Sequence, residues 1–357
     1  MALTANPTPA PAPAFRRWAV RLAALAISTL MALAVVEVGL RLFRPVEFRA
    51  PPKPAKGNAW RSMIHRRSEV PGLAYELNPG ATGQRGRERI AINSAGMRDD
   101  EPLPRTPELF RIAVVGDSST FGFGIVDARD TYANVLERRL NAEAADGRRY
   151  EVLNLGVGGY GSLDEALAFA ARAAELAPDL VIVGYSLNDP EIEPIQPLHA
   201  HFQRVEWWQR SHLLRLLAQA RDRVELQRYG GGSYYLAIHR HPAKWGSVVD
   251  AFRRFAVLGE QQGFAILLAI LPVLPDGEWG RRYRFLGLHE QVAAEGRAHG
   301  FQVIDLLPVL ETHDPGEIRV SAEDFHPNER GHQLIADALF DRLVGERDRL
   351  LSGKGAP

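Results

Sequence analysis

Between Phe110 and Leu343 the chain alternates between short apolar runs and longer amphipathic stretches, and this alternation constrains its fold more than any other feature. The apolar runs are rich in Val, Ile and Leu and have the length of strands: Arg111–Gly116, Glu151–Leu155, Asp179–Gly184, Phe264–Leu271 and Phe301–Leu306. The stretches that follow them have helical spacing: Thr131–Leu140, Ser162–Leu176, Val248–Gln262, Leu288–His299 and Gly331–Leu343. Apolar strands that alternate with helices are typical of a parallel sheet covered on both faces. The sequence therefore predicts a three-layer α/β/α fold with about five parallel strands.

An apolar segment near the N-terminus, Trp18–Phe43, predicts a transmembrane anchor. Its charge-free centre, Leu22–Val36, is shorter than the roughly 20 residues that a full span needs, but Arg21 can reach one interface and so lengthen it. A cleaved signal peptide and a soluble helix are the alternatives, and Ala32-Leu33-Ala34 resembles a cleavage site. Arginine and lysine flank both ends, so charge does not decide the orientation.

The remaining segments complete the predicted domain organisation. We expect a disordered N-terminal tail at 1–17, the anchor at 18–43, a linker and ordered preface at 44–105, and the main domain at 106–350. Residues 190–245 interrupt the alternation and carry several tryptophans and tyrosines. They form either an insertion over the site or an ordinary connection of two helices.

Charge and cysteine content exclude several classes of function. The chain has 43 basic and 43 acidic residues, so it offers no net field for nucleic acid, and we expect no nucleic-acid partner. It has no cysteine, which excludes disulfides, thiolate metal sites and a cysteine nucleophile.

Polar residues follow the predicted strands, at the sheet edge where sites of such folds form. Ser118 comes directly after the first strand in a Gly-Asp-Ser-Ser sequence, and Asp324 and His326 share a late loop. A serine nucleophile needs a base to take its proton and an acid to orient the base. The second predicted strand ends at Asn154–Gly159, which contains three glycines, and the third ends at Gly184–Asp189, which contains an asparagine. A glycine N–H and an asparagine side-chain amide at strand ends are the types of donor that an oxyanion hole requires.

Together these four blocks resemble the SGNH (GDSL-like) hydrolase superfamily, over about residues 111–343. The resemblance implies a flavodoxin-like fold. It places the family's nucleophile on Ser118, its base on His326 and its acid on Asp324. It also implies an oxyanion hole formed by the backbone N–H groups of Ser118 and Gly159 and the side-chain amide of Asn188. Many members space the acid three residues before the histidine, which makes Glu323 a rival to Asp324. The preface sequence INSAGMRDDE is similar to that of membrane-anchored bacterial members. By that similarity we expect the catalytic domain outside the cytoplasm, in the periplasm.

The implied function is a serine esterase that hydrolyses or transfers an acyl group, expected to be acetyl, on a carbohydrate or lipid-like ester. An O-acyltransferase of an envelope polysaccharide and a non-catalytic surface binding protein on the same fold are the alternatives. No metal or organic cofactor is required. The expected partners are an ester-bearing substrate, for example a polysaccharide, and the membrane.

Several other residues have structural interpretations. The sequence Gly156-x-Gly158-x-x-Gly161 matches a dinucleotide fingerprint, but the acid expected at the end of the next strand is missing. We interpret His332 and Asp189 as structural, with Asp189 supporting the loop of Asn188. Four histidines of the interrupted segment are expected to be solvated loop residues: His199, His201, His239 and His241.

Overall fold

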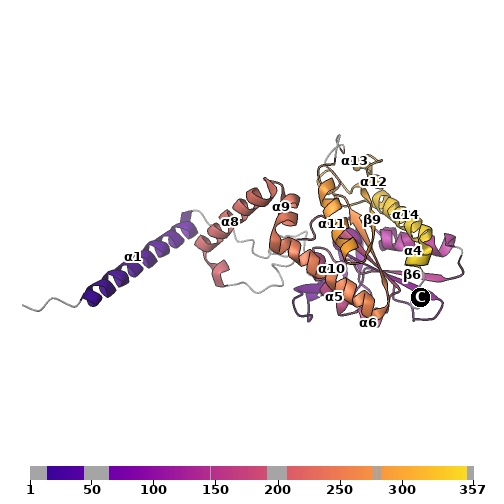
Figure 1. Cartoon of the computed structure of the whole chain (residues 1–357), viewed down its shortest axis with the longest axis horizontal. Helices are drawn as coiled ribbons and strands as arrows, with labels where there is room; N and C mark the ends of the chain where they lie inside the picture. The colour runs from indigo at the N-terminus through magenta and orange to yellow at the C-terminus, as the bar shows by residue number, and fades with distance from the viewer. Residues whose placement is uncertain are drawn as a thin grey trace, which may run out of the picture. The chain divides into compact units, whose positions relative to one another are not determined.

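The computed structural model describes residues 14–43, 64–144, 146–190, 207–275, 279 and 283–351 of the chain (Figure 1). The chain divides into two compact units. One contains Met1–Phe48 with Val205–Asp222, and the other contains Arg49–Arg204 with Arg223–Pro357. The second unit holds the predicted sheet and all predicted site residues.

The core of the second unit is a five-stranded parallel sheet. In chain order its strands are β5 (Leu109–Gly116), β6 (Arg149–Asn154), β7 (Leu180–Ser186), β8 (Ala265–Leu271) and β9 (Gln302–Asp305). In space the order is β6-β5-β7-β8-β9, and every neighbouring pair is parallel. The first strand along the chain, β5, is thus an inner strand of the sheet. β6 is added on one side of β5, and the later strands are added on the other side, so the carboxyl ends of β5 and β7 lie next to each other. This confirms the predicted fold class.

Helices cover both faces of the sheet (Figure 1). On one face, Ile112 and Val114 of β5 pack in a cluster with residues of α4 (Tyr132–Glu143) and α14 (Glu329–Gly345). On the other face, Ala113 and Val115 pack with α5 (Ser162–Ala170), α10 (Pro242–Gln262) and α11 (Leu286–Ala298). Alternate strand residues therefore enter opposite cores, as expected for a strand with period two that is buried on both faces.

Two antiparallel hairpins precede the sheet and form the ordered preface. They are β1 (His65–Arg67) with β2 (Tyr75–Leu77), and β3 (Thr82–Arg85) with β4 (Glu88–Ala91). Their buried residues Tyr75 and Ile90 share a cluster with Phe121, Phe123 and Tyr160, from the segments that follow β5 and β6. The preface therefore packs against the loops that carry the predicted site.

The first unit contains α1 (Ala14–Phe43), η2 (Trp207–Arg210) and the first turns of α8 (His212–Gly230). Residues Phe15–Phe43 are long and apolar enough to cross a membrane, with a mean hydropathy of 2.2 over the most apolar window. A signal sequence meets the same criterion, so both interpretations of this segment remain open.

One stretch that the sequence predicts as a single helix forms two helices in the structure. The stretch expected at 162–176 breaks after Ala170 and resumes as α6 (Ala173–Leu176), because Arg172 leaves the helical conformation at φ −123° and ψ −12°. Its guanidinium then donates to the carbonyl of Ala95, a bond that ties the break to the preface. The shorter elements are α3 (Ser118–Phe121), η1 (Ala128–Asp130), α9 (Tyr234–Arg240), α12 (Leu307–Leu310), α13 (Pro315–Ile318) and α15 (Arg347–Leu350).

Candidate active site

The turn after β5 positions Ser118. The strand ends at Gly116, and Asp117 caps the short helix α3 by accepting a 2.8 Å hydrogen bond from the backbone N–H of Ser119. Gly156 approaches this helix so closely that a Cβ on it would lie 2.2 Å from the backbone nitrogen of Phe121. The first glycine of the apparent nucleotide fingerprint therefore serves packing against α3.

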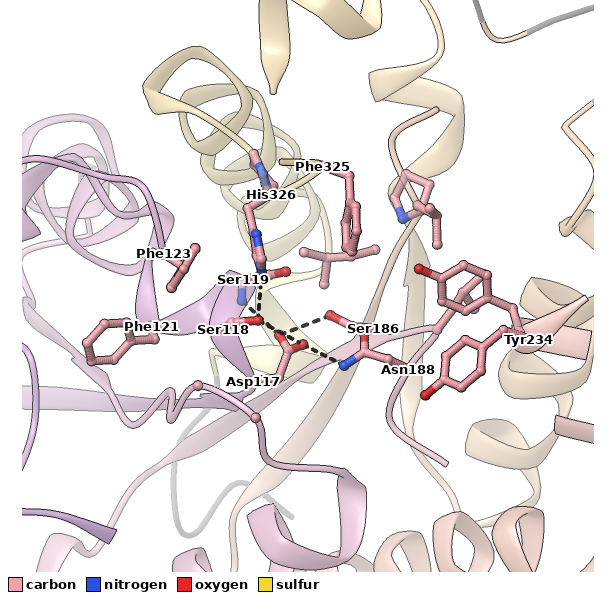
Figure 2. A pocket seen from close by; sticks show the side chains of 18 of the residues that line it. Asp117, Ser118, Ser119, Phe121, Phe123, Ser186, Asn188, Tyr234, Phe325 and His326 are labelled. Atoms are coloured by element: carbon pink, nitrogen blue, oxygen red, sulfur yellow. Dashed lines mark hydrogen bonds between the residues drawn. The ribbon is translucent and has the colours of Figure 1, made fainter. Parts of the chain in front are cut away.

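Ser118, His326 and Asp324 form a continuous hydrogen-bonded chain, and Figure 2 shows the part between Ser118 and His326. Ser118 Oγ lies 2.8 Å from His326 Nε2, and His326 Nδ1 lies 2.5 Å from Asp324 Oδ1. The serine is 208 residues away from the histidine along the chain. The order of the three groups is that of a nucleophile, a base and an orienting acid.

The carboxylate in contact with His326 is that of Asp324. Burial by itself raises the pKa of Asp324, but hydrogen bonds from His326 and the charges of His326 and Arg85 outweigh it and leave the pKa below its usual value. Arg85 Nη2 lies 3.7 Å from Asp324 Oδ2. Glu323, the rival acid, is exposed, and its backbone N–H donates to Ser321 Oγ.

The predicted oxyanion-hole residues surround Ser118. Gly159 and Asn188 line the same cavity as Ser118 and His326. Gly159 has a φ of +88°, which favours glycine there. The Asn188 amide donates one hydrogen bond of 3.1 Å to Asp117 Oδ2. An amide nitrogen carries two hydrogens, and this bond uses one of them.

Asp117 is the centre of a polar network that the sequence reasoning missed. Besides capping α3, its carboxylate accepts from Ser186 Oγ at 3.1 Å and from Asn188 Nδ2, both at the end of β7 (Figure 2). The only sequence signal was its place beside the serine, which says nothing of partners about 70 residues away. Asp117 therefore joins the turn that carries Ser118 to the side-chain amide of Asn188.

Two buried carboxyls lie near this network. Asp189 Oδ2 accepts from the backbone N–H of Ser186 at 3.2 Å, so Asp189 shapes the turn that carries Asn188. Burial raises the pKa values of Asp189 and Glu165 well above normal, and the negative charge of Asp117 raises both further. A raised pKa favours the neutral form, which avoids a buried cluster of three negative charges.

Arg98 holds the loop that follows Ser118 and the short helix α3. Its guanidinium is 1% exposed and donates hydrogen bonds of 2.6 Å to the carbonyls of Gly122 and Ile125, and one of 3.3 Å to that of Phe121. The preface motif was noticed in the sequence only as a resemblance. The structure shows that its arginine fixes the loop that follows α3.

The cavity above Ser118 has a volume of about 480 Å³ and a mixed lining (Figure 2). Its walls are mainly apolar and aromatic, including Phe121, Phe123, Leu187, Tyr234, Tyr235, Leu271, Pro272, Val273, Leu310 and Phe325. Tyr234 and Tyr235 belong to the interrupted segment, so part of that segment reaches the site. Volume and lining are those of a small-ligand pocket with a few polar groups at one end.

The remaining histidines have mixed outcomes. His332 is buried and accepts a 2.9 Å hydrogen bond from the backbone N–H of Tyr132 through Nδ1, so its predicted structural role is confirmed. The expectation for His239 was wrong, because it is 1% exposed and pairs with the hydroxyl of Tyr185 at 2.9 Å. His241 lies 3.7 Å from a carboxylate oxygen of Glu225. His199 and His201 lie outside the described residues.

The fold resembles that of several solved structures at low sequence identity. A protein titled TesA is 19% identical, with a TM-score of 0.42, and the match covers 65% of this chain and 97% of that one. A lipase/acylhydrolase from Enterococcus faecalis is 18% identical with a TM-score of 0.41, covering 66% and 96%. An acetyl xylan esterase is 13% identical with a TM-score of 0.41, covering 66% and 100%. No curated protein sequence matches the chain. The model of the GDSL-like lipase/acylhydrolase family matches residues 114–334, which is more than half of the sequence, and the chain therefore belongs to that family.

Proposed function

We propose that this protein is a serine esterase in which Ser118 is the nucleophile and His326 its base. The observation that carries the proposal is the hydrogen-bonded chain from Ser118 Oγ through both ring nitrogens of His326 to Asp324. A serine hydroxyl is a weak nucleophile alone, and a histidine whose other nitrogen faces a carboxylate is the group that activates it.

In the proposed acylation, Ser118 Oγ attacks the carbonyl carbon of the ester. His326 Nε2 takes the hydroxyl proton, and Asp324 stabilises the imidazolium that forms. The tetrahedral intermediate then collapses, and the same Nε2 gives the proton to the leaving alcohol. Water, activated by His326 in the same way, releases the acid from the acyl-serine.

The proposed oxyanion hole consists of the N–H groups of Ser118 and Gly159 and the amide of Asn188. Asp117 supports this role, because its contact with the amide holds Asn188 at the end of β7, beside the nucleophile turn. Fixed donors lower the barrier because they need no reorganisation when the negative charge develops.

We propose a substrate with a small acyl group, expected to be acetyl, on a carbohydrate or lipid-like alcohol. The cavity of about 480 Å³ far exceeds an acetyl group, so the alcohol part occupies most of it. The aromatic rings of Tyr234 and Phe325 in the lining provide flat surfaces on which a sugar ring or an apolar chain can pack.

Active-site labelling tests the nucleophile. A fluorophosphonate probe should label the wild type on Ser118, and Ser118→Ala should abolish both labelling and hydrolysis of p-nitrophenyl acetate. Ser119→Ala is the matched control, since Ser119 also lines the cavity but is not a partner of His326 in the contacts of the described residues. The double change of Ser118 and His326 to Ala should be hardly worse than either single change, because the two act as a unit.

The proposal would be refuted if Ser118→Ala hydrolysed p-nitrophenyl acetate at the wild-type rate, or if the probe labelled Ser119 in place of Ser118. Product analysis by mass spectrometry with added polysaccharide tests the destination of the acyl group. Free acid identifies an esterase, and an acylated polysaccharide identifies an acyltransferase.

We also propose that α1 is an uncleaved anchor and that the catalytic domain lies on the extracytoplasmic side. The long helix Phe15–Phe43 with its apolar centre supports the first part, and the similarity of the preface to anchored bacterial members supports the second. Full-length protein should remain in the membrane pellet after carbonate extraction, and added protease should reach the domain in spheroplasts. Recovery in the soluble cytoplasm would contradict both parts.

A further inference from the structure

The C-terminal part of α1 caps the start of α8. The carboxylate of Glu37 accepts hydrogen bonds from the backbone N–H groups of His212 at 3.0 Å and Leu213 at 2.9 Å, and from Ser211 Oγ at 2.9 Å. Arg41 pairs with the same carboxylate at 2.7 Å, one helical turn further along α1. The first N–H groups of a helix lack partners within it, so a carboxylate at this position satisfies them and also complements the helix dipole. Glu37 therefore clamps the start of α8 to α1.

This clamp lies where α1 would leave the membrane. The charge-free stretch from Leu22 to Val36 is about 22 Å long as a helix, and side-chain snorkelling of Arg21 extends it on one side. A hydrocarbon core of about 30 Å thus ends close to Glu37. If α1 is inserted as proposed above, the start of α8 lies at the depth of the lipid headgroups.

The first turns of α8 carry an exposed apolar stripe. Leu213, Leu216, Leu217 and Ala220 follow each other at i, i+3, i+4 and i+7 and so share one face of the helix. Leu216 is 41% exposed and Leu217 is 56% exposed. Adjacent exposed leucines on one helix face indicate a surface that another apolar phase covers.

The residues around the stripe are those of an interfacial helix. Trp208 precedes it, and Arg210, Arg215 and Arg221 accompany it. Tryptophan is enriched at membrane interfaces, and arginine interacts with anionic headgroups while its stem covers apolar surface. The order of tryptophan, leucines and arginines therefore fits a lipid surface better than a protein partner.

We propose that residues 207–222 form an interfacial element that lies on the membrane entered by α1. Leu216 and Leu217 insert at the boundary of headgroups and acyl chains, and Glu37 holds the element at that depth. The inference rests on the proposed anchoring of α1. The interfacial element would bind the protein to the membrane surface at a second place.

Spin labels on single cysteines test the proposal, because the chain has no native cysteine. Full-length Leu217→Cys, Asp222→Cys and Leu30→Cys would be labelled and reconstituted in vesicles of phosphatidylcholine and phosphatidylglycerol. Collisions with oxygen report the apolar phase, and collisions with a nickel chelate report water. Asp222 is the matched control, being exposed on the same helix about 140° around its axis from Leu217. Labels at 217 and 30 should collide more with oxygen, and the label at 222 more with nickel.

The outcomes separate this inference from the proposed anchor. If the label at position 217 collides mainly with the nickel chelate while the label at position 30 collides mainly with oxygen, the proposed interfacial element is wrong and the proposed anchor is supported. Nickel-accessible 30 would overturn both. A label at 217 shielded from both reagents would mean that protein, and not lipid, covers the stripe.

A second variant tests the clamp. Glu37→Ala should raise the nickel collision rate at position 217 several-fold, while the label at 30 and the hydrolysis of a soluble ester stay unchanged. An unaltered rate at 217 would show that Glu37 does not hold the element in place.

Discussion

Replacing Arg98 with methionine should destabilise the catalytic domain and slow catalysis. Methionine has a similar length but no donor, so the change leaves the carbonyls of Gly122 and Ile125 without the guanidinium in a buried loop. Hydrogen bonds from a charged donor contribute about 1.5–3 kcal/mol each. Burial lowers the pKa of Arg98 to about 10, so removing the charge also relieves a desolvation cost. We expect a net loss of about 3 kcal/mol, which is the lower end of the roughly 3–6 kcal/mol that the two bonds contribute together.

The assay is thermal unfolding together with steady-state hydrolysis of p-nitrophenyl acetate. A loss of about 3 kcal/mol corresponds to a fall in Tm of about 6–12 °C for a domain of this size. Because the loop follows directly after Ser118, kcat should fall roughly 10- to 100-fold, since a misplacement of about 1 Å can cost about 100-fold in rate. KM should change less, since most of the cavity lining lies elsewhere.

Arg89→Met is the matched control, because Arg89 lies on β4 with an exposed side chain. Surface substitutions of this kind usually change stability by less than about 0.5 kcal/mol. If Arg98→Met lowers Tm no more than Arg89→Met does, the inference that Arg98 holds the loop after Ser118 is refuted.

Three further predictions concern the site and its support. Asn188→Ala should lower kcat about 100-fold or more with a smaller change in KM, and a variant with full kcat in steady-state assays would remove the amide from the oxyanion hole. Asp324→Ala should reduce kcat strongly but leave more activity than Ser118→Ala, while Glu323→Ala should behave as wild type. A lower kcat for Glu323→Ala than for Asp324→Ala would mean that Glu323 is the acid. Burial, together with the positive charge of Arg98, lowers the pKa of His332 to about 3. Between about pH 6.5 and 3, His332 is therefore protonated in the unfolded state but neutral in the folded state. The free energy of unfolding should therefore fall by up to about 1.4 kcal/mol per pH unit in that window as the pH drops, and His332→Gln should flatten this slope in Tm measurements between pH 7 and 4.

The sequence by itself determined the layers of the fold and the region of the site. Strand-length apolar runs and helical periodicity are local patterns, and they predicted all five strands of the sheet. The rule that sites form at the carboxyl ends of parallel strands then placed Ser118, Gly159 and Asn188 at one edge, and the structure brings them around one cavity. The position of His326 relative to Ser118 came from the family resemblance, because no local pattern relates residues 208 positions apart.

Only the tertiary structure decided which groups support that site. Asp117 meets Ser186 and Asn188 because β5 and β7 are neighbours in the sheet, and the strand order was not readable from periodicity. Arg98 reaches the loop after Ser118 because the preface folds back over it. In both cases a polar side chain finds partners distant in the chain, and its burial then makes those hydrogen bonds obligatory. Local sequence patterns specify which face of a strand or helix is apolar, whereas the partner of a buried charge depends on how the elements pack against each other.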